Sequence, residues 1–176
     1  MKKFKAIKIL VLAFGLFSGL IAAQNITGKS IKVSVDGTSP MHNWTMTSSG
    51  GSFSATVNGN IINNVKFSMP AKNLKSTKGK MMDNKAYAAL KSDKAPNITF
   101  TAASMNIGKG ILTGKMTVAG STKSVVVPVT VVKNGASYNI TGSSNLKMSD
   151  FGMETPGFLG VRTGDAVTVK VNIVAN

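Results

Sequence analysis

Hydrophobic and polar residues alternate with a period of two along most of the chain beyond residue 30. The first such run covers residues 31–37, and the alternation recurs over residues 53–57, 65–69, 98–102, 112–118, 138–141 and 167–173. A period of two places successive side chains on opposite faces of a β-strand. Short turns separate the runs, and Asn58–Gly59–Asn60 and Asn134–Gly135 are typical hairpin turns. The pattern therefore predicts an all-β chain of roughly eight or nine sequential antiparallel strands.

Sequential hairpins close most economically into an up-and-down antiparallel barrel, because closure leaves no exposed strand edge. A barrel of about eight strands has an interior that side chains just fill or that holds one elongated ligand. We therefore expect an extended antiparallel β-barrel, and a β-sandwich is the architectural alternative. Which side chains point into the barrel depends on the phase of each strand, because a slip of one residue exchanges the two faces of that strand.

Residues 71–92 interrupt the alternation. Asp83 is a candidate N-cap for a short alanine-rich helix over residues 84–91, which ends before Pro96. We expect this helical insert to place Tyr87, Leu90 and either Met81 or Met82 over one end of the barrel. It would then act as a lid or as an ordinary crossover connection.

Two local irregularities are predicted within the strands. The apolar phase shifts between residues 98–102 and Met105, which indicates a bulge near Ala103 or Ser104. Pro128 lies inside the apolar run 125–132 and has no N–H to donate to a neighbouring strand. We therefore expect a strand edge or a bulge at Pro128.

The first 23 residues have the pattern of a secretory signal peptide. Four lysines between positions 2 and 8 precede an apolar run over residues 9–22, and Ala22–Ala23–Gln24 offers small residues for cleavage. The run is shorter than the roughly 20 apolar residues that span a bilayer. We therefore expect a leader over residues 1–23, one domain over residues 24–176, and export, most simply to the periplasm.

The exported part is strongly basic. Once the four leader lysines are set aside, 17 basic and 6 acidic residues remain, which is a net charge of +11. The lysines are scattered and Arg162 is the single arginine, whereas nucleic-acid sites are rich in arginine and stacked aromatics. We expect no nucleic-acid partner. The alternatives are peripheral contact with anionic membrane and an envelope or surface β-protein that binds acidic polymers.

The sequence offers little for catalysis or metal binding. It has no cysteine, a single histidine, six carboxylates and no Gly-x-Ser-x-Gly motif. Metal sites and acid–base catalysis need clusters of such groups. We therefore expect neither an enzyme nor a metal site. An integral outer-membrane barrel is disfavoured because only eight aromatic residues follow the leader, too few for aromatic girdles.

The candidate binding residues are apolar or aromatic and lie in phase with the predicted inward faces. From His42 the alternation continues through Trp44 and Met46. Methionine is flexible and adapts to long apolar ligands. The candidate lining consists of His42, Trp44, Met46, Phe53, Phe67, Met69, Phe100, Met105 and Met116. The alternative is that these residues fill an ordinary packed core, with a structural His–Trp pair at one end.

Four stretches together carry a family resemblance. They are Val35–Trp44, Met82–Lys91 leading to Pro96–Phe100, Leu112–Gly120, and Lys147–Gly152 running to Thr163–Val167. In this order they resemble the YceI-like family of exported lipocalin-like barrels associated with polyisoprenoid binding. The resemblance implies a lipocalin-like barrel that holds an amphiphile with a long isoprenoid tail, such as a quinone or a polyprenyl carrier. It matches His42 to the family's histidine and Phe151–Gly152 to its Phe-Gly loop. The stretch 153–160 is shorter than expected.

The sequence thus predicts a periplasmic, non-enzymatic binding protein for a hydrophobic small molecule. No cofactor is expected other than a bound isoprenoid lipid or quinone. We expect the ligand tail to lie inside the barrel, with His42 and Trp44 near one end.

Overall fold

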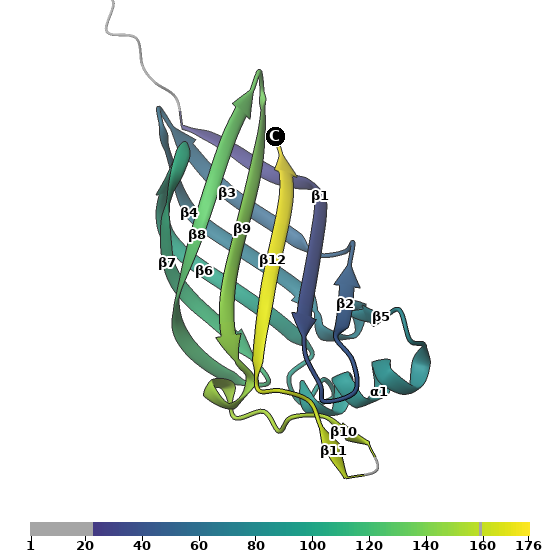
Figure 1. Ribbon diagram of the computed structural model, residues 1–176. Helices are drawn as coiled ribbons and strands as arrows, with labels where there is room; N and C mark the ends of the chain where they lie inside the picture. The colour runs from purple at the N-terminus through teal and green to yellow at the C-terminus, as the bar shows by residue number, and fades with distance from the viewer. Residues whose placement is uncertain (1–22, 159) are drawn as a thin grey trace, which may run out of the picture.

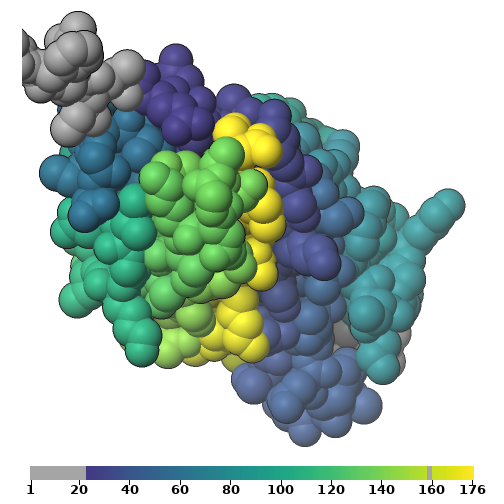
Figure 2. Space-filling view, turned by 90° about the horizontal axis from the view of Figure 1, so that it is seen from above, coloured from purple at the N-terminus to yellow at the C-terminus, as the bar shows by residue number. Residues whose placement is uncertain are grey.

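The computed structural model describes residues 23–158 and 160–176 (Figure 1), so the predicted leader lies outside the described residues apart from Ala23. Eight strands form an antiparallel barrel in the order β12-β9-β8-β7-β6-β4-β3-β1, and β1 pairs with β12 to close it. Figure 2 shows β12, in yellow, seated between the green β8–β9 hairpin and the purple β1. The strands are β1 (Gln24–Gly37), β3 (Ser52–Asn58), β4 (Ile61–Pro70), β6 (Asn97–Asn106), β7 (Gly108–Val118), β8 (Ser121–Asn134), β9 (Ser137–Lys147) and β12 (Ala166–Ala175). The predicted antiparallel barrel is confirmed.

The smaller elements gather at one end of the barrel, away from the C-terminus (Figure 1). They are β2 (Trp44–Ser48), η1 (Ala71–Asn73), β5 (Lys75–Ser76), α1 (Lys80–Ala89), η2 (Met148–Phe151), β10 (Gly157–Phe158) and β11 (Val161–Arg162). We use the name loop end for residues 38–43, α1, residues 148–158 and residues 160–165. In the described part of the chain, no helix is long and apolar enough to cross a membrane.

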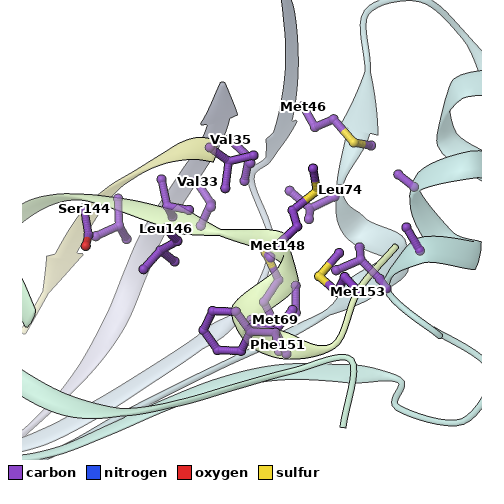
Figure 3. Close-up of a pocket in the computed structure, with 18 of the residues that line it drawn as sticks. Val33, Val35, Met46, Met69, Leu74, Ser144, Leu146, Met148, Phe151 and Met153 are labelled. Carbon is purple, nitrogen blue, oxygen red and sulfur yellow. The ribbon is translucent and has the colours of Figure 1, made fainter. Parts of the chain in front are cut away.

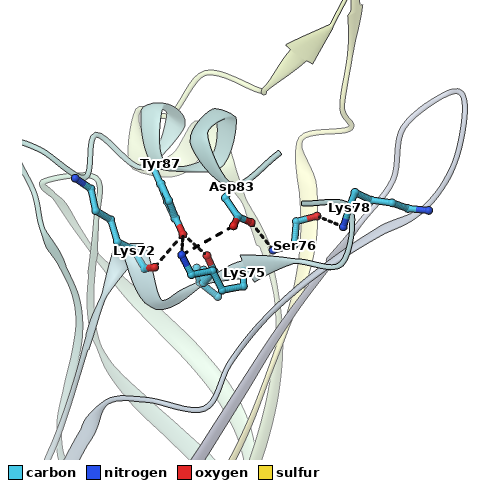
Figure 4. Close-up of polar contacts among 7 residues, drawn as sticks. Lys72, Lys75, Ser76, Lys78, Asp83 and Tyr87 are labelled. Carbon is cyan, nitrogen blue, oxygen red and sulfur yellow. Dashed lines mark hydrogen bonds and ion pairs between the residues drawn. The ribbon is translucent and has the colours of Figure 1, made fainter. Parts of the chain in front are cut away.

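Helix α1 begins earlier than predicted. Its N-cap is Gly79, so Asp83 lies within the helix and was wrongly expected to cap it. The buried Asp83 carboxylate instead accepts a hydrogen bond of 2.6 Å from the Ser76 backbone N–H. The Tyr87 hydroxyl accepts a hydrogen bond of 2.6 Å from Lys75 Nζ and lies 2.9 Å from the Lys72 carbonyl oxygen (Figure 4). The contacts with Lys75 and Ser76 hold α1 against β5. The Tyr87 hydroxyl points toward the backbone at Lys72, just before β5.

The phase shift predicted in β6 is present. It is accompanied by a matching shift in the neighbouring strand β4. Pairing of β6 with β7 covers Thr99–Thr101 and ends next to the predicted irregularity. Pairing of β6 with β4 keeps one register throughout, because β4 shifts its own register against β3. Asn64, at a φ of 54°, lies at that shift. The two strands therefore change phase together, which keeps Val65 and Met105 buried.

Pro128 lies at a branch point in the sheet. It pairs with Ile111 of β7, whereas pairing with β9 begins at the next residue, Val129. A proline is tolerated where one side of a strand needs no donor. The predicted strand edge at Pro128 is confirmed.

Candidate functional site

An apolar cavity of about 340 Å³ occupies the barrel interior, and its lining includes exposed residues of the loop end, where it opens. All eight barrel strands contribute inward side chains, because alternation leaves one face of each strand inside. In Figure 3, side chains from β1, β9 and the loop end converge on this space. The volume lies near the lower limit of ligand pockets, about 300–1,000 Å³.

All nine candidate residues line this cavity. Met46, Phe53, Met69, Phe100 and Met105 are buried, Trp44, Phe67 and Met116 are half-buried, and His42 is exposed. Contact with a ligand stays a prediction for each of them.

His42 is not on the face of a strand, contrary to the expected alternation. It precedes β2, in a turn where the Ser39 hydroxyl donates a hydrogen bond of 2.8 Å to the His42 carbonyl oxygen and accepts one of 3.2 Å from the His42 N–H. Pro40, inside this turn, cannot supply a ladder donor. The turn therefore places His42 at the mouth of the cavity, where it is exposed to solvent.

Trp44 forms part of the cavity wall beside the mouth. Its indole Nε1–H donates a hydrogen bond of 3.1 Å to the Thr38 carbonyl oxygen. The ring lies against Gly37, where an added Cβ would come within 2.8 Å of Trp44 Cη2. The indole therefore packs where any side chain larger than glycine at position 37 would lie. The indole N–H is already hydrogen-bonded within the protein.

Polar side chains in the lining are concentrated at the mouth. They are Ser39, His42, Ser76, Lys78, Lys85, Arg162 and Thr163, whereas Ser144 lies along β9. Lys85 Nζ donates to the Gly157 carbonyl oxygen at 2.9 Å. Thr163 Oγ1 is buried and has no hydrogen-bond partner among the described residues. No Asp or Glu of the described ranges lines the cavity. An apolar interior with a basic, donor-rich mouth is complementary to an amphiphile whose head accepts hydrogen bonds.

Several lining residues were not among the candidate binding residues. Met82 and Leu90 were expected over one end of the barrel, and they line the cavity together with Ala86 and Ala89 of α1. The loop end also supplies Met148, Phe151 and Met153, and β8 and β12 supply valines. The alternation over residues 167–173 already marked the β12 valines as inward. They were overlooked because the candidate set favoured methionine and aromatic residues. Methionines on opposite walls make the cavity adaptable in shape.

Asp165 fixes the short η2 turn that borders the cavity. Its carboxylate accepts hydrogen bonds from the Ser149 backbone N–H at 2.8 Å and from the Ser149 hydroxyl at 2.5 Å. These bonds, foremost the one from the hydroxyl, lower the pKa of Asp165. A lowered carboxyl pKa stabilises the folded state above the unfolded-state pKa, and this stabilisation is lost as pH falls through the folded-state value.

Asp165→Asn is therefore expected to lower the melting temperature at pH 7, with a difference that shrinks below about pH 4 as the wild-type carboxylate protonates. Thermal unfolding of both proteins between pH 3 and pH 7 measures this. Asp150→Asn, an exposed carboxylate in η2, is the matched control. A difference between wild type and Asp165→Asn that stays constant with pH would contradict the assigned role.

Comparisons with known proteins agree on one fold. A family model described as the YceI-like domain matches residues 6–175, and no curated protein matches the chain. BcnA of Burkholderia cenocepacia is 23% identical with a TM-score of 0.69, covering 83% of this chain and 96% of its own. A polyisoprenoid binding domain from Saccharophagus degradans is 8% identical with a TM-score of 0.69, covering 86% and 97%. The Campylobacter jejuni YceI protein is 18% identical with a TM-score of 0.52, covering 99% and 90%.

The two structures with a TM-score of 0.69 share the barrel at identities that establish the fold alone. The family model spans nearly the whole chain, from residue 6 to residue 175. The barrel and its short helix are those of the lipocalin-like fold of this family. The chain therefore belongs to the YceI-like family.

Proposed function

We propose that this protein is a non-enzymatic periplasmic carrier that holds a long-chain isoprenoid or similar amphiphilic lipid. The tail lies in the barrel cavity and the head lies at the mouth. The observation that carries the proposal is an apolar cavity, lined by every barrel strand, whose polar and basic residues are concentrated at one end. Membership of the YceI-like family and the fold shared with a polyisoprenoid binding domain support it.

The tail supplies most of the binding free energy in this proposal. Burial of one methylene contributes about 0.8 kcal/mol, so about ten of them contribute about 8 kcal/mol before ordering costs, which corresponds to a micromolar Kd. A longer chain gains affinity only where the methionine side chains move to admit it. The head adds selectivity, because Lys78, Arg162 and Thr163 favour a phosphate or a quinone carbonyl over an apolar end.

A second candidate function rests on the outer surface. The net charge of +11 after the leader favours peripheral contact with anionic membranes or acidic polymers. Such binding falls with ionic strength, because exposed charges are screened over about 10 Å at 0.1 M salt. Tail burial does not depend on salt in this way, so a salt titration separates the two modes.

The single tryptophan provides a direct test of the proposed carrier function. After organic extraction and refolding, titration with geranylgeraniol is expected to shift Trp44 emission to shorter wavelength and to saturate at about one ligand per chain, because the ring lines the cavity beside the mouth. Geraniol, with half the tail, is the matched ligand and is expected to bind much more weakly. Unchanged emission and no heat of binding would overturn the proposal.

A further inference from the structure

Strands β8 and β9 separate from one another on the side of the barrel nearest the loop end. Their pairing covers Val129–Asn134 against Ser137–Gly142 and ends there. Beyond that point β8 remains paired with β7 as far as Ser121, and β9 remains paired with β12 as far as Lys147. Residues 123–127 of β8 and 143–147 of β9 therefore face each other across an interrupted ladder, which we call the seam. Pro128 and Gly142 flank its closed end.

The seam separates the central cavity from a groove on the outside of the barrel. The groove is lined by Lys123, Ser124, Val125, Val126, Ser144, Asn145, Leu146, Asp150 and Phe151. Ser144, Leu146 and Phe151, labelled in Figure 3, also line the central cavity. Because they line both spaces, these three side chains form the partition between them. Across the seam, the Ser144 hydroxyl donates a hydrogen bond of 3.0 Å to the Val126 carbonyl oxygen.

Gly142 lies where the two strands part. A Cβ at this position would come within 3.2 Å of Val127 Cγ1 and 3.3 Å of Val129 Cγ1. Glycine there lets both valines of β8 approach the inner face of β9. The strands are in close contact at the branch and separate beyond it.

The four-residue η2 turn closes the seam. It follows β9 directly and packs against both β8 and β9, with Phe151 only 3% exposed. Besides the Ser149–Asp165 bonds, η2 is held by the Met148 N–H, 3.0 Å from the Asp165 carbonyl oxygen, and by Lys91 Nζ, 3.0 Å from the Gly152 carbonyl oxygen. Gly152, at a φ of 64°, is in the left-handed region and ends the turn. A short turn fixed by a few exposed bonds opens at lower cost than a paired strand.

We infer that the seam is a side entrance to the cavity and that Phe151 is the side chain that closes it. This inference rests on the proposed carrier function. A long tail that entered only end-on would have to thread past the mouth and α1. If β8 and β9 separate at the seam, the tail can instead enter the cavity from the side while the head remains in water. The exposed rim of the seam has an apolar part, because Val126 is 54% exposed, and it carries one charge of each sign, on Lys123 and Asp150. Its apolar part suits delivery from a lipid surface.

A covalent bridge across the seam tests the inference. The chain has no cysteine, so a Val126→Cys/Asn145→Cys protein reacts with a short bifunctional maleimide only at the introduced pair. Both positions line the outer groove but not the central cavity. The matched control is Val132→Cys/Asn139→Cys, which bridges the same two strands where they are already paired. Each double variant before bridging controls for the substitutions themselves.

The readout is the exchange of an anthranilate-labelled geranylgeranyl probe, followed by stopped-flow fluorescence. Bridging the seam is expected to slow association and dissociation by about tenfold each and to leave Kd unchanged, because a gate sets rates without changing the bound state. The control bridge is expected to leave both rates unchanged. Phe151→Ala is expected to speed both.

The outcomes separate the two proposals. Unchanged rates in the seam-bridged protein, with normal equilibrium binding of the probe, would overturn the side entrance and leave the carrier function standing. No binding of the probe by the unmodified protein would overturn both.

Discussion

Met116→Trp is expected to raise the Kd for geranylgeraniol by about a hundredfold. Met116 is half-buried on β7 and lines the central cavity, so an indole in its place projects into a void of about 340 Å³. Excluding about four methylenes of the tail removes about 3 kcal/mol of burial, which is about a hundredfold in Kd. Isothermal titration calorimetry measures the change without relying on tryptophan emission.

Ile111→Trp is the matched control for this substitution. Ile111 lies on the same strand with the opposite phase, and its side chain is 71% exposed. The same indole on the outer face is expected to leave Kd unchanged. Wild-type affinity in a folded Met116→Trp protein, judged by circular dichroism, would show that the ligand does not occupy the cavity beside β7.

Gly114→Ala is expected to destabilise the barrel by about 2 kcal/mol, because an added methyl group overpacks a closed site. A Cβ at this position would lie 2.6 Å from the Thr101 carbonyl oxygen and 2.7 Å from Phe100 Cε2. The ring can shift into the cavity, but the carbonyl belongs to the neighbouring strand, so the β6–β7 pair has to part. Thermal unfolding is expected to show a melting temperature lower by about 6 °C.

Gly110→Ala provides the control on the same strand. A Cβ at Gly110 meets no atom of the described residues within 4 Å, so only the backbone effect of replacing glycine remains. Its melting temperature is expected to equal that of wild type or to exceed it slightly. Equal losses of stability in the two variants would contradict the steric role assigned to Gly114.

The barrel was predictable because the alternation of side chains is a local property of the sequence. In β7, Leu112 and Met116 fall on the inward face while Ile111 falls outside, as the period of two requires. The same alternation correctly placed Phe53 of β3 and Met69 of β4 inside the barrel, where they line the cavity. The edge at Pro128 was also a local signal, because it depends only on the missing N–H.

The wrong predictions concern residues whose contacts with other segments cannot be seen in the local sequence pattern. Asp83 was expected to cap a helix, but the Ser76 N–H, seven residues earlier, uses its carboxylate. His42 was assigned to a strand, but it lies in a turn with Ser39, and the strand begins only at Trp44. The seam could not be predicted for the same reason. Pro128 marked an edge, but only the tertiary structure shows that this edge faces β9 and that Phe151 fills the gap.

Native mass spectrometry of the protein purified from its own cells tests the central claim most directly. We predict a complex heavier than the polypeptide by one long-chain lipid, which organic extraction releases for identification. We also predict that Met116→Trp carries much less of it. A bare polypeptide mass, with no lipid taken up on incubation with geranylgeraniol or a polyprenyl phosphate, would contradict the carrier function and leave the basic outer surface as the functional feature.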